Sequence, residues 1–528
     1  MHGLSARGDA ASSSGTARLL RSLLGAGLAS LLLGLCVYRL MCVHAGPDPD
    51  TDAYGHFSIA RQLLATPLEL RIHWVWLPLY HLLLAGPVAL GASLDQVREA
   101  NALAAGLPPL LLLWALARPK HEAPGSPGSA TPQLPSTPLS LVPLGAALLA
   151  AASPLLVQLG TTGQMEVCFC TLLMLAVALL TRERFGAAAA VLGALVLTRY
   201  EGWAVAAVVS AVLLGRRLFA RTPLGAGGWA CALGPGACVL AWAALRRLGG
   251  EPWFGFILDN QAFAERVLDG AHSETPSAVL PLLRYLVIVP WRSFGLAAAC
   301  ALLGVGPTLR REGIWLVAPG AAILAFLTLS SLTRSQLGLD RHFTSVVPFA
   351  ATWIAHGLAR LVAQLASALE RLGAPARSRQ GAAGLVLLAF ALSMATRVSD
   401  SLGGWLAATR QALREPRAVA QFLRGTPAGA PIVCEDAAVV VLSGLAPERF
   451  VRAPLDAGFE ARLGELSRSS DVYVVHRARN LRALASPDSL SRGLPTRGWL
   501  SHGALSYGAL DGAPDALVVL RFATGQRR

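Results

Sequence analysis

Acidic and aromatic side chains cluster directly after the first long apolar run of the chain. The segment 48–56 reads Asp-Pro-Asp-Thr-Asp-Ala-Tyr-Gly-His, which brings Asp50, Asp52, Tyr54 and His56 within seven residues. A carboxylate partly sheltered from water has its charged form disfavoured, and this makes it a stronger base. The segment therefore contains candidate catalytic carboxylates, among them Asp52. The alternative is a solvated acidic loop in which Asp50 or Asp52 caps the following helix.

Two further carboxylates lie at the edges of apolar runs. Glu166 ends the sequence Thr-Thr-Gly-Gln-Met-Glu and opens an apolar run, and Glu201 follows Arg199 in Thr-Arg-Tyr-Glu-Gly. A carboxylate at a helix N-terminus is stabilised by the helix dipole, which is a complete structural explanation for Glu166. The pair Arg199 and Glu201 can equally be a local ion pair at a tight hairpin. A second carboxylate close to Asp52 would instead supply the orienting or metal-binding partner that a base requires.

The composition indicates a membrane protein. Of the 528 residues 54% are hydrophobic and 14% are charged, whereas soluble domains carry about 25% charged residues. The formal net charge is +14, but the arginines lie mainly in loops between apolar runs. This pattern favours membrane topology and lipid phosphates over nucleic acid. The eight cysteines show no metal-ligand spacing and are interpreted as small buried hydrophobic residues.

The elements that must position these groups are apolar runs of spanning length, about 20 residues each. Residues 77–92 are apolar as well, and they are interpreted as a helix at the interface, because most basic loops then become cytoplasmic. The prediction is about eleven transmembrane helices, with the N-terminus cytoplasmic and the C-terminus extracytoplasmic. The predicted spans are 22–43, 97–117, 138–157, 167–181, 185–198, 203–220, 227–245, 285–306, 313–331, 343–362 and 381–398.

This topology places the candidate acids on one side of the membrane. The extracytoplasmic segments are 44–96, which carries juxtamembrane helices, then 158–166, 246–284 and 332–342. Several arginines also fall on this side, against the usual bias. Contact with lipid headgroups is one explanation, and bidentate phosphate binding is the other. These arginines are Arg246, Arg247, Arg284, Arg292, Arg334 and Arg341.

Hydrophobicity falls after residue 398, so we predict two domains, 1–398 in the membrane and 399–528 outside it. Residues 415–423 read as a helix, 436–442 as helix or strand, and three β-rich segments near 431–434, 471–475 and 516–522 as strands. Alternating elements of this kind predict a small extracytoplasmic α/β domain. It contains no Gly-rich phosphate loop or dinucleotide-binding fingerprint. The fold class is an all-α polytopic membrane protein with this α/β domain appended.

Residues 20–400 resemble the GT-C superfamily of membrane glycosyltransferases, which use polyprenyl-phosphate sugars. The family's acidic residue and following helix match Asp52 and Ala-Arg-Gln-Leu-Leu at 60–64, and its Pro-Leu-Tyr segment matches residues 78–80. Thr-Arg-Tyr-Glu-Gly at 198–202 resembles a bacterial Thr-Arg-Pro-Glu-Gly motif. Residues 341–349 resemble the late Arg-Tyr-hydrophobic-Pro-Phe motif. Bacterial relatives of protein O-mannosyltransferases and aminoarabinose transferases are the nearest in pattern.

The resemblance implies an inverting glycosyltransferase of a bacterial-type plasma (inner) membrane. It would move a sugar from a polyprenyl-phosphate donor to an acceptor hydroxyl of a glycan, lipid or protein. Asp52 would be the base, and Glu166 would orient the acceptor or hold a metal. No cofactor is certain. A divalent metal, Mg²⁺ or Mn²⁺, is one possibility, but Glu166 has no paired carboxylate, so a metal requirement stays open. The alternative function is a transporter or flippase of lipid-linked saccharide. The predicted substrate-binding residues are Asp50, Tyr54, His56, Tyr80, His81, Arg199, Glu201, Arg247, Arg341 and His342.

Overall fold

The protein is described by a computed structural model in which the chain forms two compact units. The first unit comprises Met1–Ala45 and Leu63–Ala407, and the second comprises Gly46–Gln62 and Ala408–Arg528. A short segment from the predicted first loop therefore belongs to the same unit as the C-terminal region. The structure describes residues 6–117, 141–270, 283–335, 337, 339–434, 436–451, 459–477, 499–501 and 517–522.

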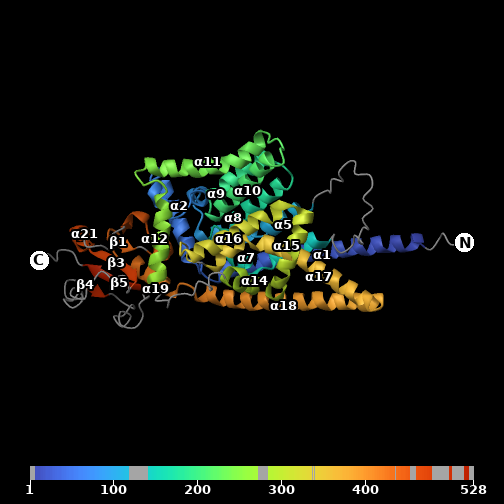
Figure 1. Ribbon diagram of the computed structural model, residues 1–528. Helices are drawn as coiled ribbons and strands as arrows, with labels where there is room; N and C mark the ends of the chain where they lie inside the picture. Colours follow the sequence, from blue (N-terminus) through green and yellow to red (C-terminus); the bar gives the residue numbers. More distant parts are fainter. Residues whose placement is uncertain are drawn as a thin grey trace. The chain divides into compact units, whose positions relative to one another are not determined.

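The first unit is helical throughout its described part (Figure 1). Each of the eleven predicted apolar runs contains helix, and the runs 97–117 and 138–157 are each divided into two helices. The helices are α1 (Ala6–Ala45), α3 (Leu79–Ala89), α4 (Leu94–Ala104), α5 (Leu107–Leu116), α6 (Val142–Ala151), α7 (Pro154–Leu159), α8 (Glu166–Leu180), α9 (Phe185–Val196), α10 (Glu201–Leu218), α11 (Ala226–Leu248), α12 (Gly255–Gly270), α14 (Val289–Phe294), α15 (Cys300–Glu312), α16 (Ala318–Leu332), α17 (Val347–Arg371) and α18 (Ala376–Gln411). Short turns are η1 (Leu70–His73), η4 (Gly295–Ala299), η5 (Ile314–Leu316), η6 (Asp340–Ser345) and the π-helical η3 (Arg284–Ile288).

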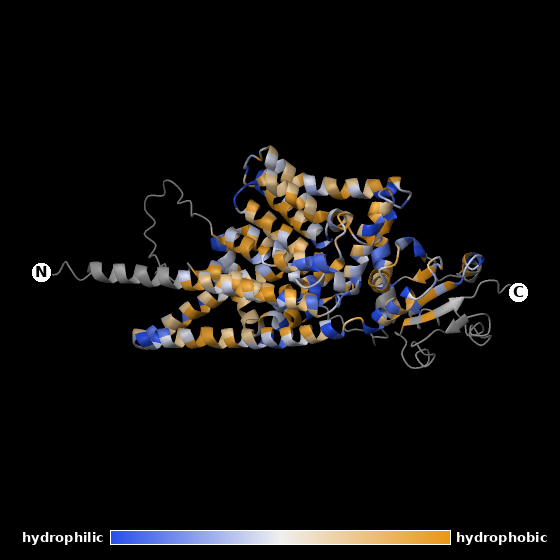
Figure 2. Cartoon of the chain, turned by 180° about the vertical axis from the view of Figure 1, so that it is seen from behind, coloured by the Kyte–Doolittle hydropathy of each residue, from blue (hydrophilic) through white to orange (hydrophobic). Residues whose placement is uncertain are grey.

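Six helical segments of the described chain are long and apolar enough to cross a membrane, and apolar residues cover the helices of the first unit (Figure 2). Four shorter apolar helices, α3, α6, α8 and α9, have 10–17 residues. Since α3 is no shorter than α6, helix length alone does not decide which of the short helices are spans. The protein is a polytopic helical membrane protein, and the count of eleven stays a prediction. The six segments are Ser22–Ala45, Leu94–Leu116, Ala226–Leu248, Arg284–Glu312, Ile314–Leu332 and Ala376–Arg424.

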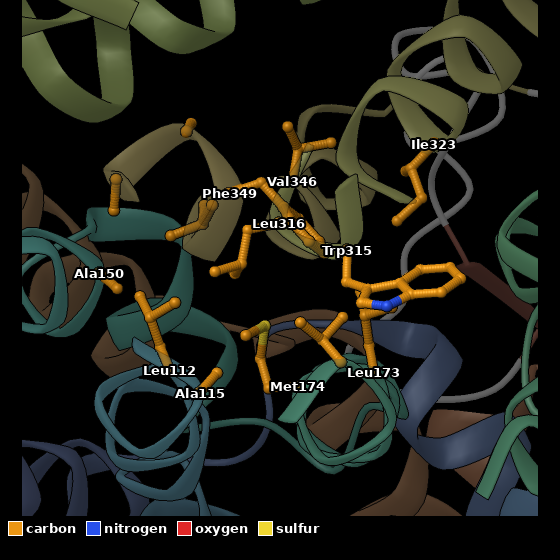
Figure 3. Packing of buried hydrophobic residues seen from close by; sticks show 14 of the residues in the cluster. Leu112, Ala115, Ala150, Leu173, Met174, Trp315, Leu316, Ile323, Val346 and Phe349 are labelled. Carbon is orange, nitrogen blue, oxygen red and sulfur yellow. The ribbon is translucent and has the colours of Figure 1, made fainter. Parts of the chain in front are cut away.

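The core of the first unit is formed by apolar side chains of α5, α6, α8, α16 and α17 (Figure 3). Leu173 and Met174 of α8 are fully buried there and lie across from Trp315 and Leu316 of η5. Helices α15 and α17 approach each other to backbone contact. A Cβ atom on Gly304 would lie only 1.6 Å from the carbonyl oxygen of Trp353. No side chain fits at this helix crossing, so glycine is required.

The described strands of the second unit form a five-stranded mixed sheet in the order β2-β1-β3-β5-β4. Strand β1 pairs parallel with β2 and β3, whereas β5 pairs antiparallel with β3 and β4. The strands predicted near 431–434, 471–475 and 516–522 are present as β1, β3 and β5, while β2 and β4 were not predicted. The strands are β1 (Ile432–Cys434), β2 (Phe450–Val451), β3 (Val472–Arg477), β4 (Trp499–Ser501) and β5 (Leu517–Phe522).

The helices of the second unit are α2 (Thr51–Ala65), whose last residues pass into the first unit, α19 (Arg414–Arg424), α20 (Ala437–Ser443) and α21 (Phe459–Leu466). The ambiguous segment 436–442 is helical, because Asp436 accepts hydrogen bonds from the backbone N–H groups of Ala438 and Val439 and caps α20. Gly46 lies against the C-terminal part of the unit. A Cβ atom there would be 2.5 Å from the carbonyl oxygen of Thr409.

Candidate functional site

A buried network of charges joins the starts of α8 and α10. The Arg199 guanidinium donates from Nε and Nη2 to the two carboxylate oxygens of Glu201, at 3.2 and 2.8 Å, and from Nη1 to Glu166 Oε1 at 2.7 Å. All three side chains are at most 9% exposed. The structure thus brings together three residues that the sequence predicted separately. Arg199 uses three of its five N–H groups on these carboxylates.

The tight connection between α9 and α10 fixes this geometry. Gly202 follows Glu201, and a Cβ atom there would lie 2.6 Å from the carbonyl oxygen of Leu195, so the turn accepts only glycine. Burial alone would raise the pKa of the Glu201 carboxyl, but the Arg199 guanidinium lowers it below its usual value. Burial likewise opposes the charge of Arg199, yet Glu201 and Glu166 raise the pKa of the guanidinium above its ordinary value. Glu201 and Arg199 are therefore both ionised at neutral pH.

The loop before Glu166 is held through its backbone carbonyl groups. Arg98 Nε donates to the carbonyl of Thr161, and Asn101 Nδ2 donates to those of Thr162 and Gln164, at 2.8–3.1 Å. Tyr80 donates from its hydroxyl to the carbonyl of Gly163 at 2.7 Å. Four consecutive carbonyl groups are thus fixed by three side chains.

Tyr80 was predicted from the sequence, whereas Arg98 and Asn101 were not. The available signal was an arginine and an asparagine inside the predicted span 97–117, because polar groups in spans usually meet partners within the protein. Their contacts give them a structural task, which is to position the N-terminus of α8 and with it Glu166.

Residues of η6 complete the network. Arg341 Nε lies 3.7 Å from Glu166 Oε1, and Cys170 of α8 donates from its thiol to the carbonyl oxygen of Thr344 at 3.4 Å. Burial, together with the positive charge of Arg199, lowers the pKa of His342 to about 3. His342 is therefore neutral at physiological pH, and the cluster of Arg199, Arg341, Glu166 and Glu201 carries no net charge.

A second ionic group lies beside it, around Asp340. Arg284 donates from Nε and Nη2 to Asp340 Oδ1 at 2.9 and 2.7 Å, and Arg292 donates to Oδ2 at 2.9 Å. Eight residues of regular α-helix would set the two arginines about 80° apart around the axis. The wider π turn η3 takes up much of this difference, and such turns are frequent at functional sites. Two guanidinium groups share one carboxylate, which leaves one positive charge in excess.

The remaining predicted residues of the first unit have local partners. His81 and His73 are both buried, with their Nδ1 atoms 2.8 Å apart. Burial and the nearby Arg246 lower the pKa of His73 to about 4, so this ring is neutral. Arg247 donates to the backbone carbonyl of Glu251 at 3.4 Å. The neighbouring Arg246 is the buried member and bonds the Glu251 carboxylate at 2.7 Å.

The acidic segment after α1 lies in the second unit. Asp50 Oδ1 accepts from the N–H of Asp52 at 3.0 Å, so Asp50 caps α2, as one of the two sequence interpretations expects. Asp52 lies in the first turn of α2 and is partly exposed, while Tyr54 and His56 are buried. Tyr54 donates from its hydroxyl to the carbonyl oxygen of Asp48 at 3.3 Å. Because Asp52 and Glu166 belong to different units, their pairing stays a prediction.

The charged cluster of the first unit suits a divalent cation poorly. Arg199 and Arg341 both approach Glu166 Oε1, and a metal ion bound there would be repelled by two guanidinium groups. Within the described residues, no three His, Cys, Asp or Glu side chains form a group that could hold a metal ion.

No protein-family model matches the chain, and no curated protein matches its sequence. The fold, in contrast, is similar to a solved structure, that of ArnT from Cupriavidus metallidurans in the apo state. The TM-score is 0.54 at 15% sequence identity, and the match covers 96% of this chain and 99% of that chain. The expected GT-C fold is thereby confirmed.

Proposed function

We propose that this protein is an inverting glycosyltransferase that moves a sugar from a polyprenyl phosphate to an acceptor hydroxyl at the extracytoplasmic membrane face. The observation that carries the proposal is the charged network at the starts of α8, α10 and α17, on a fold similar to that of ArnT. ArnT is an aminoarabinose transferase with a GT-C fold. Such a network supplies fixed charges where a phosphate leaves and a hydroxyl attacks.

The proposed topology has eleven spans with the N-terminus cytoplasmic. It places Glu166, Glu201 and Arg341 at the same membrane face as Asp52. It also places the basic pair Arg310 and Arg311, at the end of α15, in the cytoplasm, in agreement with the positive-inside rule. The plasma membrane of a bacterial-type cell is the proposed location.

In the proposed reaction, the acceptor oxygen attacks the anomeric carbon on the face opposite the phosphate. The new carbon–oxygen bond forms as the bond to the phosphate oxygen breaks, so the anomeric configuration inverts. The bonding electron pair leaves with the phosphate, and the acceptor proton passes to the Asp52 carboxylate. Glu166, held by Arg199, orients the acceptor or the base.

The leaving phosphate gains negative charge, and the arginines are assigned according to their partners. Arg199 is occupied by two carboxylates, so we assign it to holding Glu166 and Glu201 in place. Arg341, together with the excess positive charge at Arg284 and Arg292, is assigned to the phosphate. Tyr80 positions the loop before Glu166. The other candidates, Asp50, Tyr54, His56, His81 and Arg247, remain proposed substrate contacts.

The test is sugar transfer by purified protein in liposomes, from a radiolabelled polyprenyl-phosphate sugar to lipid and glycan acceptors. Asp52→Asn keeps the shape of the side chain but removes the base, and turnover should fall about 10²- to 10⁴-fold. Asp436→Asn is the matched control in the same unit, because asparagine caps a helix as well as aspartate does. Equal activity of the two variants would refute the assignment of Asp52. Movement of the label across the bilayer without product would favour the flippase.

A further inference from the structure

Four buried polar atoms beside Arg199 have no hydrogen-bond partner within the described part of the chain. Gln164 lies in the loop before α8, Glu166 is the first residue of α8, and His342 and Thr344 come from η6. Buried polar atoms in folded proteins are nearly always paired, so each unpaired atom requires an explanation. The atoms are Gln164 Nε2, Glu166 Oε2, His342 Nδ1 and Thr344 Oγ1. We name this group the polar pocket.

These atoms lie in one neighbourhood. Helix α8 and η6 are in contact through the thiol of Cys170 and the carbonyl oxygen of Thr344, 3.4 Å apart. Arg341 of η6 also approaches Glu166 to 3.7 Å. Gln164 and Thr344 are each 1% exposed, so bulk water does not reach their side chains. A buried water or a bound ligand must therefore supply the partners of these atoms.

The loop that carries Gln164 is held in place through its backbone carbonyl groups. Its backbone carbonyl accepts a hydrogen bond from Asn101 at 3.1 Å, and the preceding carbonyl of Gly163 accepts one from Tyr80 at 2.7 Å. These contacts fix the backbone of the loop. The geometry of a ligand site held this way is set before binding, which reduces the entropy lost when a ligand enters.

The chemistry of the four atoms selects the ligand class. Gln164 Nε2 is a donor, Glu166 Oε2 is an acceptor, and the hydroxyl of Thr344 is both. An ionised phosphate accepts hydrogen bonds and would leave the acceptor Glu166 Oε2 without a donor. An ammonium group needs an uncompensated carboxylate, but Arg199 and Arg341 already neutralise Glu166 and Glu201. Hydroxyl groups, each of which donates and accepts, match the mixed set.

We propose that the polar pocket binds the hydroxyl groups of an uncharged sugar, and that the donor of this protein carries a neutral sugar. This inference rests on the proposed function and adds the substrate class. Glu166 accepts from one sugar hydroxyl, while Gln164 and Thr344 bond further sugar oxygens. The neutral ring of His342 offers Nδ1 as an additional partner.

The experiment compares two probes on purified protein in detergent. The first is a synthetic farnesyl phosphate, and the second is the same lipid carrying glucose, mannose or arabinose. Dissociation constants are measured by calorimetry. Thr344→Val removes one hydroxyl without changing the shape, and it should weaken the best sugar-bearing probe about 3- to 10-fold while leaving farnesyl phosphate unchanged. Gln164→Met should behave in the same way.

Thr352→Val is the matched control, because Thr352 is also fully buried but donates its hydroxyl to the carbonyl of Pro348 in its own helix. It should leave both affinities unchanged. The polar pocket would be overturned if Thr344→Val had the same affinities as Thr352→Val, or if it weakened the binding of both probes equally. If a farnesyl phosphate bearing 4-amino-4-deoxyarabinose binds more tightly than the neutral probes, the inference that the donor sugar is uncharged is overturned.

The same measurements separate this inference from the proposed function. A wild-type protein that binds farnesyl phosphate but gains no affinity from any attached sugar would refute the polar pocket alone. A wild-type protein that binds neither probe would refute the glycosyltransferase proposal and the pocket together.

Discussion

Replacing Arg199 by leucine would leave two buried carboxylates without the cation they share. Glu201 depends on Arg199 most, since it is 3% exposed and receives two of the three bonds, and His342 beside it is neutral. Glu166 keeps Arg341 at 3.7 Å. Breaking a buried pair by removing one partner costs about 3–5 kcal/mol. We expect Arg199→Leu to lower the free energy of unfolding by that amount at neutral pH.

The loss should depend on pH, with a definite sign. In the wild type, the pKa of Glu201 in the folded state lies below its unfolded value. Its stabilising contribution is present above the unfolded value and is lost as the pH falls through the folded pKa. Without Arg199, burial raises the pKa of Glu201 above the unfolded value. The variant then regains stability as the pH falls, so the difference from wild type should shrink between pH 8 and about pH 5.

The assay is unfolding of the purified protein in mixed micelles of dodecyl sulfate, followed by tryptophan fluorescence at several pH values. Arg379→Leu is the control, because Arg379 pairs with Glu370 at 2.7 Å but Glu370 is 67% exposed. Exposed pairs contribute about 0–1 kcal/mol. A loss for Arg199→Leu no larger than that for Arg379→Leu, or one that grows as the pH falls, would refute the account of the network.

Two further outcomes are expected. Gly304→Ala should abolish folded protein in detergent extracts, because its Cβ atom would lie 1.6 Å from the carbonyl oxygen of Trp353. Gly306→Ala is the control and should fold normally, since the space around Gly306 is open. Equal yields of the two variants by size-exclusion chromatography would contradict the close helix crossing. The wild type should lose stability as the pH falls from about 6.5 towards 4, since the folded pKa of His73 is about 4 and the unfolded chain binds the proton first. The pKa of His342 is lowered in the same direction and contributes to the same loss. His73→Gln should therefore reduce the slope in that part of the pH profile, and an unchanged slope would argue against a contribution from His73.

The helices were predictable because membrane spans are long apolar runs. A helix is present at each predicted run, and the β-rich segments of the tail form strands. The break between α4 and α5 has a local signal, because Gly106 precedes α5 and Pro108 and Pro109 lie in its first turn. The π turn at Arg284 has no such signal. Arg284 contacts Asp340, 56 positions later in the chain, and no local pattern records that contact.

The sequence indicated which residues carry charge at the site but not how they pair. Arg199 and Glu201 are close in sequence, so their pairing could be expected. The hydrogen bond from Arg199 to Glu166 joins residues 33 positions apart, and because of it Arg199 is bound to two carboxylates and not to one. The polar pocket was missed because Gln164 and Thr344 are ordinary polar residues in sequence. Only burial without a partner distinguishes them.

The second unit is assembled from two distant pieces of chain, and this has a consequence for biosynthesis. Residues 46–62, which carry Asp52, leave the ribosome more than 300 residues before the region from Ala408 onward that completes their unit. At about 5–20 residues per second, that interval lasts roughly 20–70 s. During this time the segment has no completed unit to fold into. The proposed base would thus be fixed in place only when the last part of the chain has been made, so unfinished chains would lack activity.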